Sequence, residues 1–363
     1  MKTTHSIYFG KSQQMSSIKD GSVNLIITSP PYPMIEMWDD IFSLQNPQIR
    51  TALDANDTST AFELMHKELD AVWDECYRVL KDGSFLCINI GDATRTINGD
   101  FSLYNSHSRI VQHCLSIGFN NLPNIIWHKP TNAPNKFMGS GMLPCGAYVT
   151  LEHEYILIFR KGGKRIYKAN EEKQTRRQSA FFWEERNTWF SDIWDFRGTK
   201  QKIANSDTRE RSAAFPLEIP YRLINMYSQA GDIILDPFFG LGTTTQAAMI
   251  LGRDSIVYEI DSKLQKTIEA GISSICTDDV NKLLLQRYNN HLEFIKGYIA
   301  KKGNAKHHNA YLNCDVVTSQ EADMELHFIE SIERCKSEHL KYECCYETVS
   351  DMSKPPSLKN SLF

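Results

Sequence analysis

The segment Thr28-Ser29-Pro30-Pro31-Tyr32 places a hydroxyl, two prolines and an aromatic ring directly after the apolar run 23–27. Two consecutive prolines fix φ and remove two N–H donors, so the loop is stiff and its carbonyl groups only accept hydrogen bonds. The Ser29 hydroxyl and the Pro30 carbonyl can accept the two hydrogens of an exocyclic –NH2 group, while Tyr32 offers a ring face for stacking. The pattern indicates a pocket for a planar amine, although a strand followed by a proline-rich turn accounts for the same residues.

A second segment, 233–244, reads as an apolar strand that runs into a glycine turn and then into a helix over 245–251. Gly240 and Gly242 let the backbone approach a ligand closely. The spacing is neither G-x-G-x-x-G nor that of a phosphate loop, which argues against a dinucleotide or a nucleoside triphosphate. Glu259 ends the next apolar strand, at the place where such folds bind ribose hydroxyls. The segment therefore predicts a cofactor turn.

Together the two segments resemble those of amino-methylating DNA methyltransferases of the β class, in which D/N/S-P-P-Y/F precedes D-P-F-x-G-x-G-T. The similarity covers roughly residues 5–272. It implies a Rossmann-like α/β fold with a mostly parallel seven-stranded sheet. It also implies a circular permutation, so that the fourth strand is read early and the first strand late. The cofactor implied is S-adenosyl-L-methionine and the partner is double-stranded DNA.

The resemblance assigns roles to residues of both motifs. The catalytic residues are Ser29, Pro30, Pro31 and Tyr32. The cofactor-binding residues are Asp236, Phe238, Gly240, Gly242, Thr243, Glu259, Phe215 and Gly10. Acceptors that hold both amine hydrogens stabilise the positive charge that grows on the nitrogen in the transition state. The methyl group moves by direct in-line displacement, and a target base in duplex DNA must first be flipped out of the stack.

The choice of target base rests on Ser29. In this family Ser before Pro-Pro-Tyr usually goes with cytosine N4 and Asp with adenine N6, so the sequence favours a site-specific cytosine-N4 methyltransferase of a restriction-modification system. Adenine N6 is the alternative. Cytosine C5 methylation needs a cysteine nucleophile. The only Pro-Cys pair, Pro144-Cys145, lacks the Glu-Asn-Val that follows it in C5 enzymes, and we interpret Cys145 as incidental. An RNA methyltransferase or an inactive nucleic-acid-binding module is a further alternative.

Basic charge is concentrated in one part of the chain. The net charge is −4, yet residues 160–211 carry +6. Aromatic residues interleave with these cations, a mixture expected where phosphates and bases are contacted, although we expect most of the aromatics to form a small core. The resemblance places the target-recognition region here. The predicted DNA-binding residues are Lys161, Lys164, Arg165, Arg176, Arg177, Arg186 and Arg197.

The chain divides into four expected parts. These are a catalytic half of the core (1–159), the target-recognition insertion (160–212), a cofactor-binding half (213–274) and a helical C-terminal extension with a partly disordered tail (275–363). Apolar spacing predicts a helix over 61–80. Residues 33–59 lack periodicity and are expected to form a lid or a DNA-facing loop. An apolar stripe over 283–299 is expected to dock on the core, with a homodimer contact or a share in DNA recognition as the alternatives.

Composition excludes several classes. The chain has 363 residues and a 41% apolar share, which is ordinary for a soluble protein. No run of 18 apolar residues and no apolar leader is present, so neither a membrane span nor secretion is predicted. The nine cysteines show no paired C-x-x-C motifs, which favours reduced thiols, a cytoplasmic location and no metal site.

Overall fold

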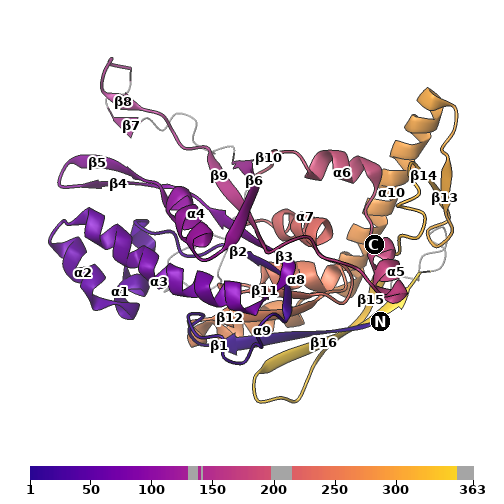
Figure 1. Ribbon diagram of the computed structural model, residues 1–363, viewed down its shortest axis with the longest axis horizontal. Helices are drawn as coiled ribbons and strands as arrows, with labels where there is room; N and C mark the ends of the chain where they lie inside the picture. The colour runs from indigo at the N-terminus through magenta and orange to yellow at the C-terminus, as the bar shows by residue number, and fades with distance from the viewer. Residues whose placement is uncertain (130–137, 140–141, 198–214, 350–363) are drawn as a thin grey trace.

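A ten-stranded sheet runs through the molecule in the order β10-β6-β9-β3-β2-β11-β12-β1-β16-β15 (Figure 1). The computed structural model describes residues 1–129, 138–139, 142–197 and 215–349. The strands of the sheet are β1 (Lys2–Phe9), β2 (Val23–Thr28), β3 (Leu80–Ile90), β6 (Phe119–His128), β9 (His153–Lys161), β10 (Ile193–Asp195), β11 (Ile233–Asp236), β12 (Asp254–Glu259), β15 (His327–Arg334) and β16 (Leu340–Thr348). Short two-stranded hairpins pair β4 (Ala93–Ile97) with β5 (Asp100–Tyr104), β7 (Met138–Gly139) with β8 (Ala147–Tyr148), and β13 (His307–Asn309) with β14 (Cys314–Val316).

The central part of the sheet has the predicted permuted order. Strand β2, read early in the chain, lies between β3 and β11, and it pairs in parallel with β11 through Leu25 opposite Ile234. Every residue of β2 is buried, as expected for a strand that is covered on both faces. Only β9 runs antiparallel among the seven central strands. The predicted count of seven strands is wrong, because β10 extends one edge and β16 with β15 extend the other.

Helices cover both faces of the sheet. One face packs against η1 (Glu36–Trp38), α1 (Asp39–Gln45), α2 (Pro47–Asp54), α3 (Thr58–Val79) and α4 (Ser106–Ser116). The other packs against α7 (Glu218–Tyr227), α8 (Thr243–Ile250), η2 (Ser262–Leu264), α9 (Gln265–Ser273) and α10 (Thr277–Lys302). Two further helices, α5 (Asn170–Gln178) and α6 (Trp183–Trp189), belong to the insertion. The sheet therefore separates two apolar cores.

Helix α3 confirms the helix predicted over 61–80 from its apolar spacing. Its buried side includes Met65, Leu69 and Trp73, which lie on one face at intervals of three or four residues. The cap is Asp57, whose carboxylate accepts the backbone N–H of Thr60. The helix stops where Leu80 becomes extended and starts β3.

Residues 33–59 are ordered into helices, so the prediction of an irregular lid or loop is wrong in its local structure. Helices α1 and α2 are seven and eight residues long, too short to show a clear period in the sequence. Phe42 and Ile49 anchor them in the core. Asn46 caps α2, and Pro47 occupies its first position, where a missing N–H costs nothing.

The C-terminal extension is helical only in its first part. Helix α10 confirms that part, and Leu284, Tyr288 and Ile295 of the predicted stripe are buried within this chain. The rest forms strands: β16 pairs antiparallel with β1, with Ile7 opposite Leu340, and β15 pairs with β16. The prediction missed these strands because it read a helix where buried and polar residues alternate along β16. The tail predicted to be partly disordered, 350–363, lies outside the described residues.

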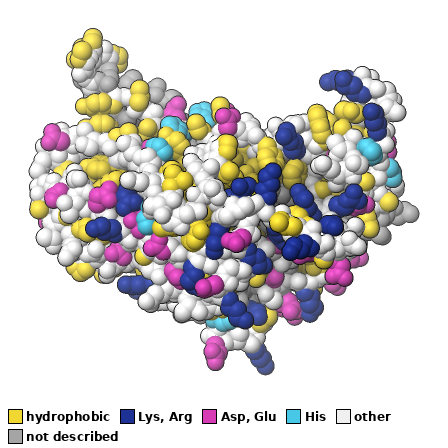
Figure 2. Space-filling model, in the orientation of Figure 1, with side chains coloured by type: hydrophobic (Ala, Val, Ile, Leu, Met, Phe, Trp, Pro, Cys, Tyr) yellow, Lys and Arg dark blue, Asp and Glu magenta, His cyan; other side chains and the backbone are white. Residues whose placement is uncertain are grey.

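Two projections rise from the same side of the molecule (Figure 1). One carries the β7-β8 hairpin, and the other consists of the C-terminal end of α10 with β13 and β14. Helix α6 and strand β10 lie between them. The space-filling view shows a hollow between the projections, with hydrophobic and basic side chains along it (Figure 2).

Candidate active site

The two motifs meet at the carboxyl ends of β2 and β11. Asp236, the last residue of β11, accepts hydrogen bonds of 2.7 Å from the hydroxyls of Thr28 and Thr244 and one of 3.0 Å from the N–H of Phe238. Burial raises the pKa of Asp236, and these hydrogen bonds oppose that effect. The carboxylate thus ties the residue before Ser29 to the glycine turn and to helix α8. Ligands of open α/β sheets bind at this edge, where the strand order reverses.

The glycine turn is shaped by two left-handed residues and one carboxylate. Gly240 has φ +58° and Gly242, which precedes α8, has φ +93°. A Cβ on Gly242 would lie 2.9 Å from Cζ of Phe239, so a side chain there meets both strain and a clash. Glu259 accepts the N–H of Gly240 through one oxygen and that of Asp261 through the other, each at 2.9 Å. The turn and the end of β12 are therefore fixed to each other.

A pocket opens between this turn and the proline loop. It encloses about 1090 Å³, counted to its open mouth. Most of the predicted catalytic and cofactor-binding residues line it, namely Ser29, Pro30, Pro31, Phe215, Asp236, Phe238, Gly240, Thr243 and Glu259. Gly242 and Gly10 lie beside the lining, and the N–H of Gly10 donates to the carbonyl of Glu259 at 2.9 Å. We call this candidate binding site the cofactor pocket, and its lining unites residues of both motifs.

Part of the cofactor pocket comes from residues that were not predicted individually as cofactor-binding residues. Ser12 and Gln13 follow β1, while Trp38, Ile41 and Gln45 come from η1 and α1. Gln13 Nε2 donates to Gln45 Oε1 at 2.5 Å, which joins the two segments. Within the segment 33–59, η1 and α1 therefore form part of the pocket wall, whereas α2 contributes no lining residue.

Tyr32 lies outside the lining of the cofactor pocket, and its hydroxyl belongs to a polar cluster. Its hydroxyl donates to Glu154 Oε2 at 2.8 Å and accepts from Asn89 Nδ2 at 2.9 Å. Asn89 also donates to Glu154 Oε2 at 2.7 Å, and Lys129 Nζ lies 2.5 Å from Glu154 Oε1. Burial and the neighbouring carboxylate of Glu154 raise the pKa of Tyr32 well above its usual value. The Tyr32 phenol therefore stays protonated. Its hydroxyl is fixed by hydrogen bonds to Glu154 and Asn89.

The proline loop lies directly against this cluster. The Ser29 and Tyr32 hydroxyl oxygens are 3.3 Å apart, and Asn89 Nδ2 is 3.5 Å from the Ser29 oxygen. A Cβ on Gly91 would lie 3.0 Å from Tyr32 Cε2, so the backbone also packs on the ring. Asn89, Lys129 and Glu154 went unnoticed in the sequence. The signal was a polar residue at the carboxyl ends of β3 and β6 and at the amino end of the antiparallel β9, which only the sheet order brings together.

Comparisons with known proteins identify the family of this chain. A family model described as DNA methylase, for N6 and N4 methyltransferases, matches residues 23–270. The chain belongs to this DNA methylase family. It is 47% identical over 362 residues to the type II methyltransferase M.MthZI of Methanothermobacter thermautotrophicus, covering 99% of this chain and 100% of that protein. It is 50% identical over 281 residues to the type II methyltransferase M.MjaI of Methanocaldococcus jannaschii, covering 74% of this chain and 91% of the relative.

Solved structures resemble the methylase as well. A putative DNA modification methylase from Thermus thermophilus, complexed with S-adenosyl-L-methionine, is 30% identical, with a TM-score of 0.57 over 73% of this chain and 92% of that one. The cytosine-N4-specific PvuII DNA methyltransferase is 15% identical, with a TM-score of 0.53 over 77% of this chain and 91% of its own. At that identity the second likeness shows the fold.

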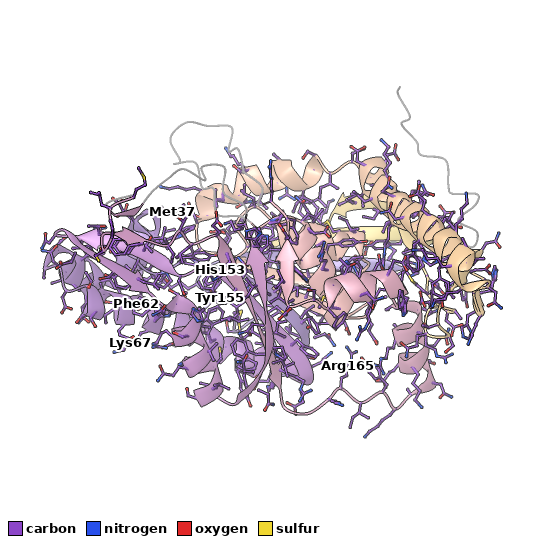
Figure 3. All side chains as sticks on the ribbon, turned by 90° about the horizontal axis from the view of Figure 1, so that it is seen from above. Met37, Phe62, Lys67, His153, Tyr155 and Arg165 are labelled. Atoms are coloured by element: carbon purple, nitrogen blue, oxygen red, sulfur yellow. The ribbon has the colours of Figure 1, made fainter. Side chains whose placement is uncertain are left out.

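Three of the predicted DNA-binding cations of the methylase lie at the edge of the sheet opposite the site. Strand β9 runs antiparallel, so it begins with His153 at the ligand edge and delivers Lys161, Lys164 and Arg165 to the far one. Lys161 Nζ donates to two backbone carbonyls at 2.7 and 2.9 Å. Arg165 pairs with Asp232 at 2.6 Å, and Figure 3 shows it well apart from His153 and Tyr155. We therefore leave these cations out of the proposed DNA surface.

The other four cations divide between two places. On α5, Arg176 stacks over Tyr167 with its guanidinium carbon 4.6 Å from the ring centre, and Arg177 pairs with Asp323 at 2.9 Å. Arg186 on α6 and Arg197 after β10 are exposed, and β10 pairs in parallel with the last residues of β6, at the ligand edge. The aromatics of the insertion form the expected core, in which Phe182, Trp189 and Trp194 are buried.

Three other features concern residues 1–129, 138–139, 142–197 and 215–349. No group of three His, Cys, Asp or Glu in these ranges is arranged to hold a metal ion. Within the same ranges, no helix combines the length and apolarity that a membrane crossing requires. Cys145 is exposed between β7 and β8, outside the lining of the cofactor pocket and outside the cluster around Tyr32.

Proposed function

We propose that the methylase transfers a methyl group from S-adenosyl-L-methionine to the N4 amine of a flipped cytosine in duplex DNA, within a type II restriction-modification system. The observation that carries the proposal is the position of Ser29. Its hydroxyl oxygen lies 3.3 Å from the Tyr32 hydroxyl on one side, and its residue lines the cofactor pocket on the other. A base stacked on Tyr32 is thus presented to a donor in that pocket.

The cofactor pocket suits S-adenosylmethionine in its chemistry. Glu259 supplies a carboxylate for ribose hydroxyls, and Phe238 and Ile260 supply apolar surface for a flat ring. The first turn of α8, after Gly242, offers backbone N–H groups for a carboxylate. When bound, S-adenosylmethionine supplies an electrophilic methyl group on a sulfonium. The structure thus supports six of the eight predicted cofactor residues as lining, with Gly10 and Gly242 shaping the turns.

The proline loop prepares the amine for attack. The Ser29 hydroxyl and the Pro30 carbonyl accept its two hydrogens, and both interactions strengthen as the nitrogen becomes positive. Pro31 stiffens the loop. After transfer the nitrogen carries one surplus proton, which passes through the Ser29 hydroxyl to water. Tyr32 holds the base by stacking, and its protonated hydroxyl remains bonded to Glu154 throughout.

The identity of the base is tested by product analysis. Ser29, which family resemblance associates with cytosine, supports the N4 position. Mass analysis of nucleosides from methylated DNA should give N4-methyldeoxycytidine, and exclusive N6-methyldeoxyadenosine would overturn the assignment to cytosine. Methylome sequencing of DNA from cells that express the chain adds the recognition sequence. Residues 160–212 are the proposed target-recognition region, with Arg186 and Arg197 as its DNA contacts.

The role of the proline loop is tested by Ser29→Ala. Loss of one amine acceptor should lower kcat about 100-fold. S-adenosylmethionine affinity should stay within about twofold, because the cofactor pocket keeps its other lining residues. Ser16→Ala, in the exposed loop after β1, is the matched control. A folded Ser29→Ala enzyme with unchanged kcat contradicts the proposed role.

A further inference from the structure

Buried charged side chains of α10 join the C-terminal extension to the insertion by ion pairs with α6. The guanidinium of Arg287 binds both oxygens of Glu185 on α6 at 2.6 and 2.7 Å. His291 Nδ1 pairs with Glu184 Oε1 at 2.8 Å, and its Nε2 donates to the carbonyl of Asp315 at 2.9 Å. The imidazole also stacks on Phe182 with ring centres 3.8 Å apart. Because both ring nitrogens face acceptors, His291 is a buried cation held between the two segments.

The segment after β14 makes further hydrogen bonds to the insertion. Glu321 accepts the backbone N–H of Trp183 at 2.9 Å, and Glu325 accepts the side-chain amide of Gln178 at 2.6 Å. The backbone N–H of Glu325 also bonds to the carbonyl of Gln178. Both helices of the insertion, α5 and α6, are therefore bound directly to the C-terminal extension. A surface that begins on α6 can continue onto α10 without a flexible joint.

An aromatic and basic surface does continue in that way. Trp183 is 38% exposed and stacks with Phe294 of α10, their ring centres 5.8 Å apart, and Tyr298 lies one turn further on. From residue 294 to residue 314 the chain has four lysines and neither Asp nor Glu. These exposed lysines are Lys296, Lys301, Lys302 and Lys306. Asp315 ends the stretch, paired with His308 at 3.0 Å.

We propose that the end of α10 and the turn to β13 form a second DNA-contacting arm, which holds the phosphate backbone of the duplex beside the target site. The inference rests on the proposed function in that the ligand is duplex DNA. The arm rises beside the hollow, opposite the β7-β8 hairpin, and basic side chains gather at its tip (Figures 1 and 2). Lysines are point charges suited to phosphates, and they carry no base preference.

Complementing the helix dipole is another use for lysines in the last turn of α10. That effect falls off within one turn, so it does not extend to Lys306, which follows the helix. A dipole role predicts an effect on stability and none on DNA. A phosphate role predicts the reverse, together with a change in salt dependence.

The test compares two charge-reversal triples. Lys301→Glu/Lys302→Glu/Lys306→Glu removes the arm's charge, and Lys19→Glu/Lys67→Glu/Lys336→Glu makes the same change at exposed sites elsewhere. Lys19 lies on the loop before β2, Lys67 on α3 (Figure 3), and Lys336 on the turn between β15 and β16. Binding is measured on a short duplex that holds the target and on one with long flanks, each at several salt concentrations.

The arm variant should bind the long duplex at least about tenfold more weakly, equally for all sequences, with a salt slope lower by about 3. The short duplex and S-adenosylmethionine affinity should be unaffected. If the salt slope of DNA binding by the arm variant equals that of the control triple, the proposal of a DNA-contacting arm is refuted. Lys→Gln at the same three positions gives the same comparison if charge reversal prevents folding. Product analysis on the same DNA keeps the two proposals apart, because an adenine product refutes the cytosine assignment and leaves the slope result unchanged.

Discussion

Replacing Glu154 by glutamine keeps the shape of this side chain and removes the charge that three donors share. Tyr32, Asn89 and Lys129 lie 2.8, 2.7 and 2.5 Å from its oxygens. An amide offers one acceptor oxygen and turns its –NH2 toward the remaining donors, so at least one donor loses its partner. Hydrogen bonds to charged groups contribute about 1.5–3 kcal/mol each, against about 1 kcal/mol for neutral pairs.

The size of the effect follows from burial. Lys129 has a side chain that is 39% exposed, so water screens its pair with Glu154 and we assign that pair little energy. Asn89 is buried, and its bond and that of Tyr32 to the carboxylate are the ones that position the ring. Weakening both should cost about 1.4–2.8 kcal/mol in the transition state, which lowers kcat by about 10- to 100-fold.

The assay separates positioning from folding. Single-turnover kcat, S-adenosylmethionine affinity by calorimetry, and thermal unfolding are measured for Glu154→Gln and for Glu152→Gln. Glu152 is an exposed neighbour just before β9 and serves as the control. Cofactor affinity should be unchanged, because Glu154 lies outside the lining of the cofactor pocket. Fluorescence of 2-aminopurine at the target position should fall as the flipped base is held less well. Wild-type kcat in a folded Glu154→Gln enzyme refutes the positioning role.

Three further perturbations have defined outcomes. Asp236→Ala leaves the buried Thr28 hydroxyl without its acceptor, which should lower the free energy of unfolding by about 2–4 kcal/mol and weaken cofactor binding, as denaturant titration and calorimetry measure. Gly240→Val forces a β-branched residue to φ +58°, a strain of about 1–3 kcal/mol that should raise the cofactor Kd, while a normal Kd contradicts a rigid turn. Burial lowers the pKa of His291, but hydrogen bonds to Cys314 and Glu184 outweigh it and raise the pKa to about 10. Because this pKa exceeds the ordinary histidine value of 6.5, the contribution of His291 to the free energy of unfolding is complete below pH 6.5 and is lost as the pH rises through 10. Urea unfolding at several pH values should show this decline, and His291→Gln should flatten the pH dependence.

The parts of the site that follow from local signals were predictable. An apolar run that stops at Ser29-Pro30-Pro31 marks a strand end, and Gly240 with Gly242 marks a turn, whatever the rest of the chain does. The parallel pairing of β2 with β11 then brings the two together, as the permuted order requires. The family resemblance supplied that order, which spacing alone does not contain.

The cluster behind Tyr32 was hidden for a physical reason. Asn89, Lys129 and Glu154 come from three strands and meet only because β9 reverses direction between β3 and β6. Each residue taken singly reads as an ordinary polar group at a strand end. Helices α1 and α2 were missed for a different reason, since seven or eight residues give too few turns for a period to emerge.

The distribution of charge along the sequence marks the insertion as basic, but it does not show which of its cations are free to bind DNA. Lys161 is bonded to backbone carbonyls, and Arg165 and Arg177 are paired with carboxylates, so each already has a partner that DNA must displace. A cation that exchanges one partner for another releases fewer counterions than an exposed one, and it adds less to the salt slope. The exposed lysines at the end of α10 fall outside the counted segment. The apolar stripe of that helix predicted docking on the core, with a dimer contact or a share in DNA recognition as alternatives, and it did not indicate these lysines. The salt dependence of DNA binding should therefore follow the end of α10 more closely than it follows the most basic stretch of the sequence.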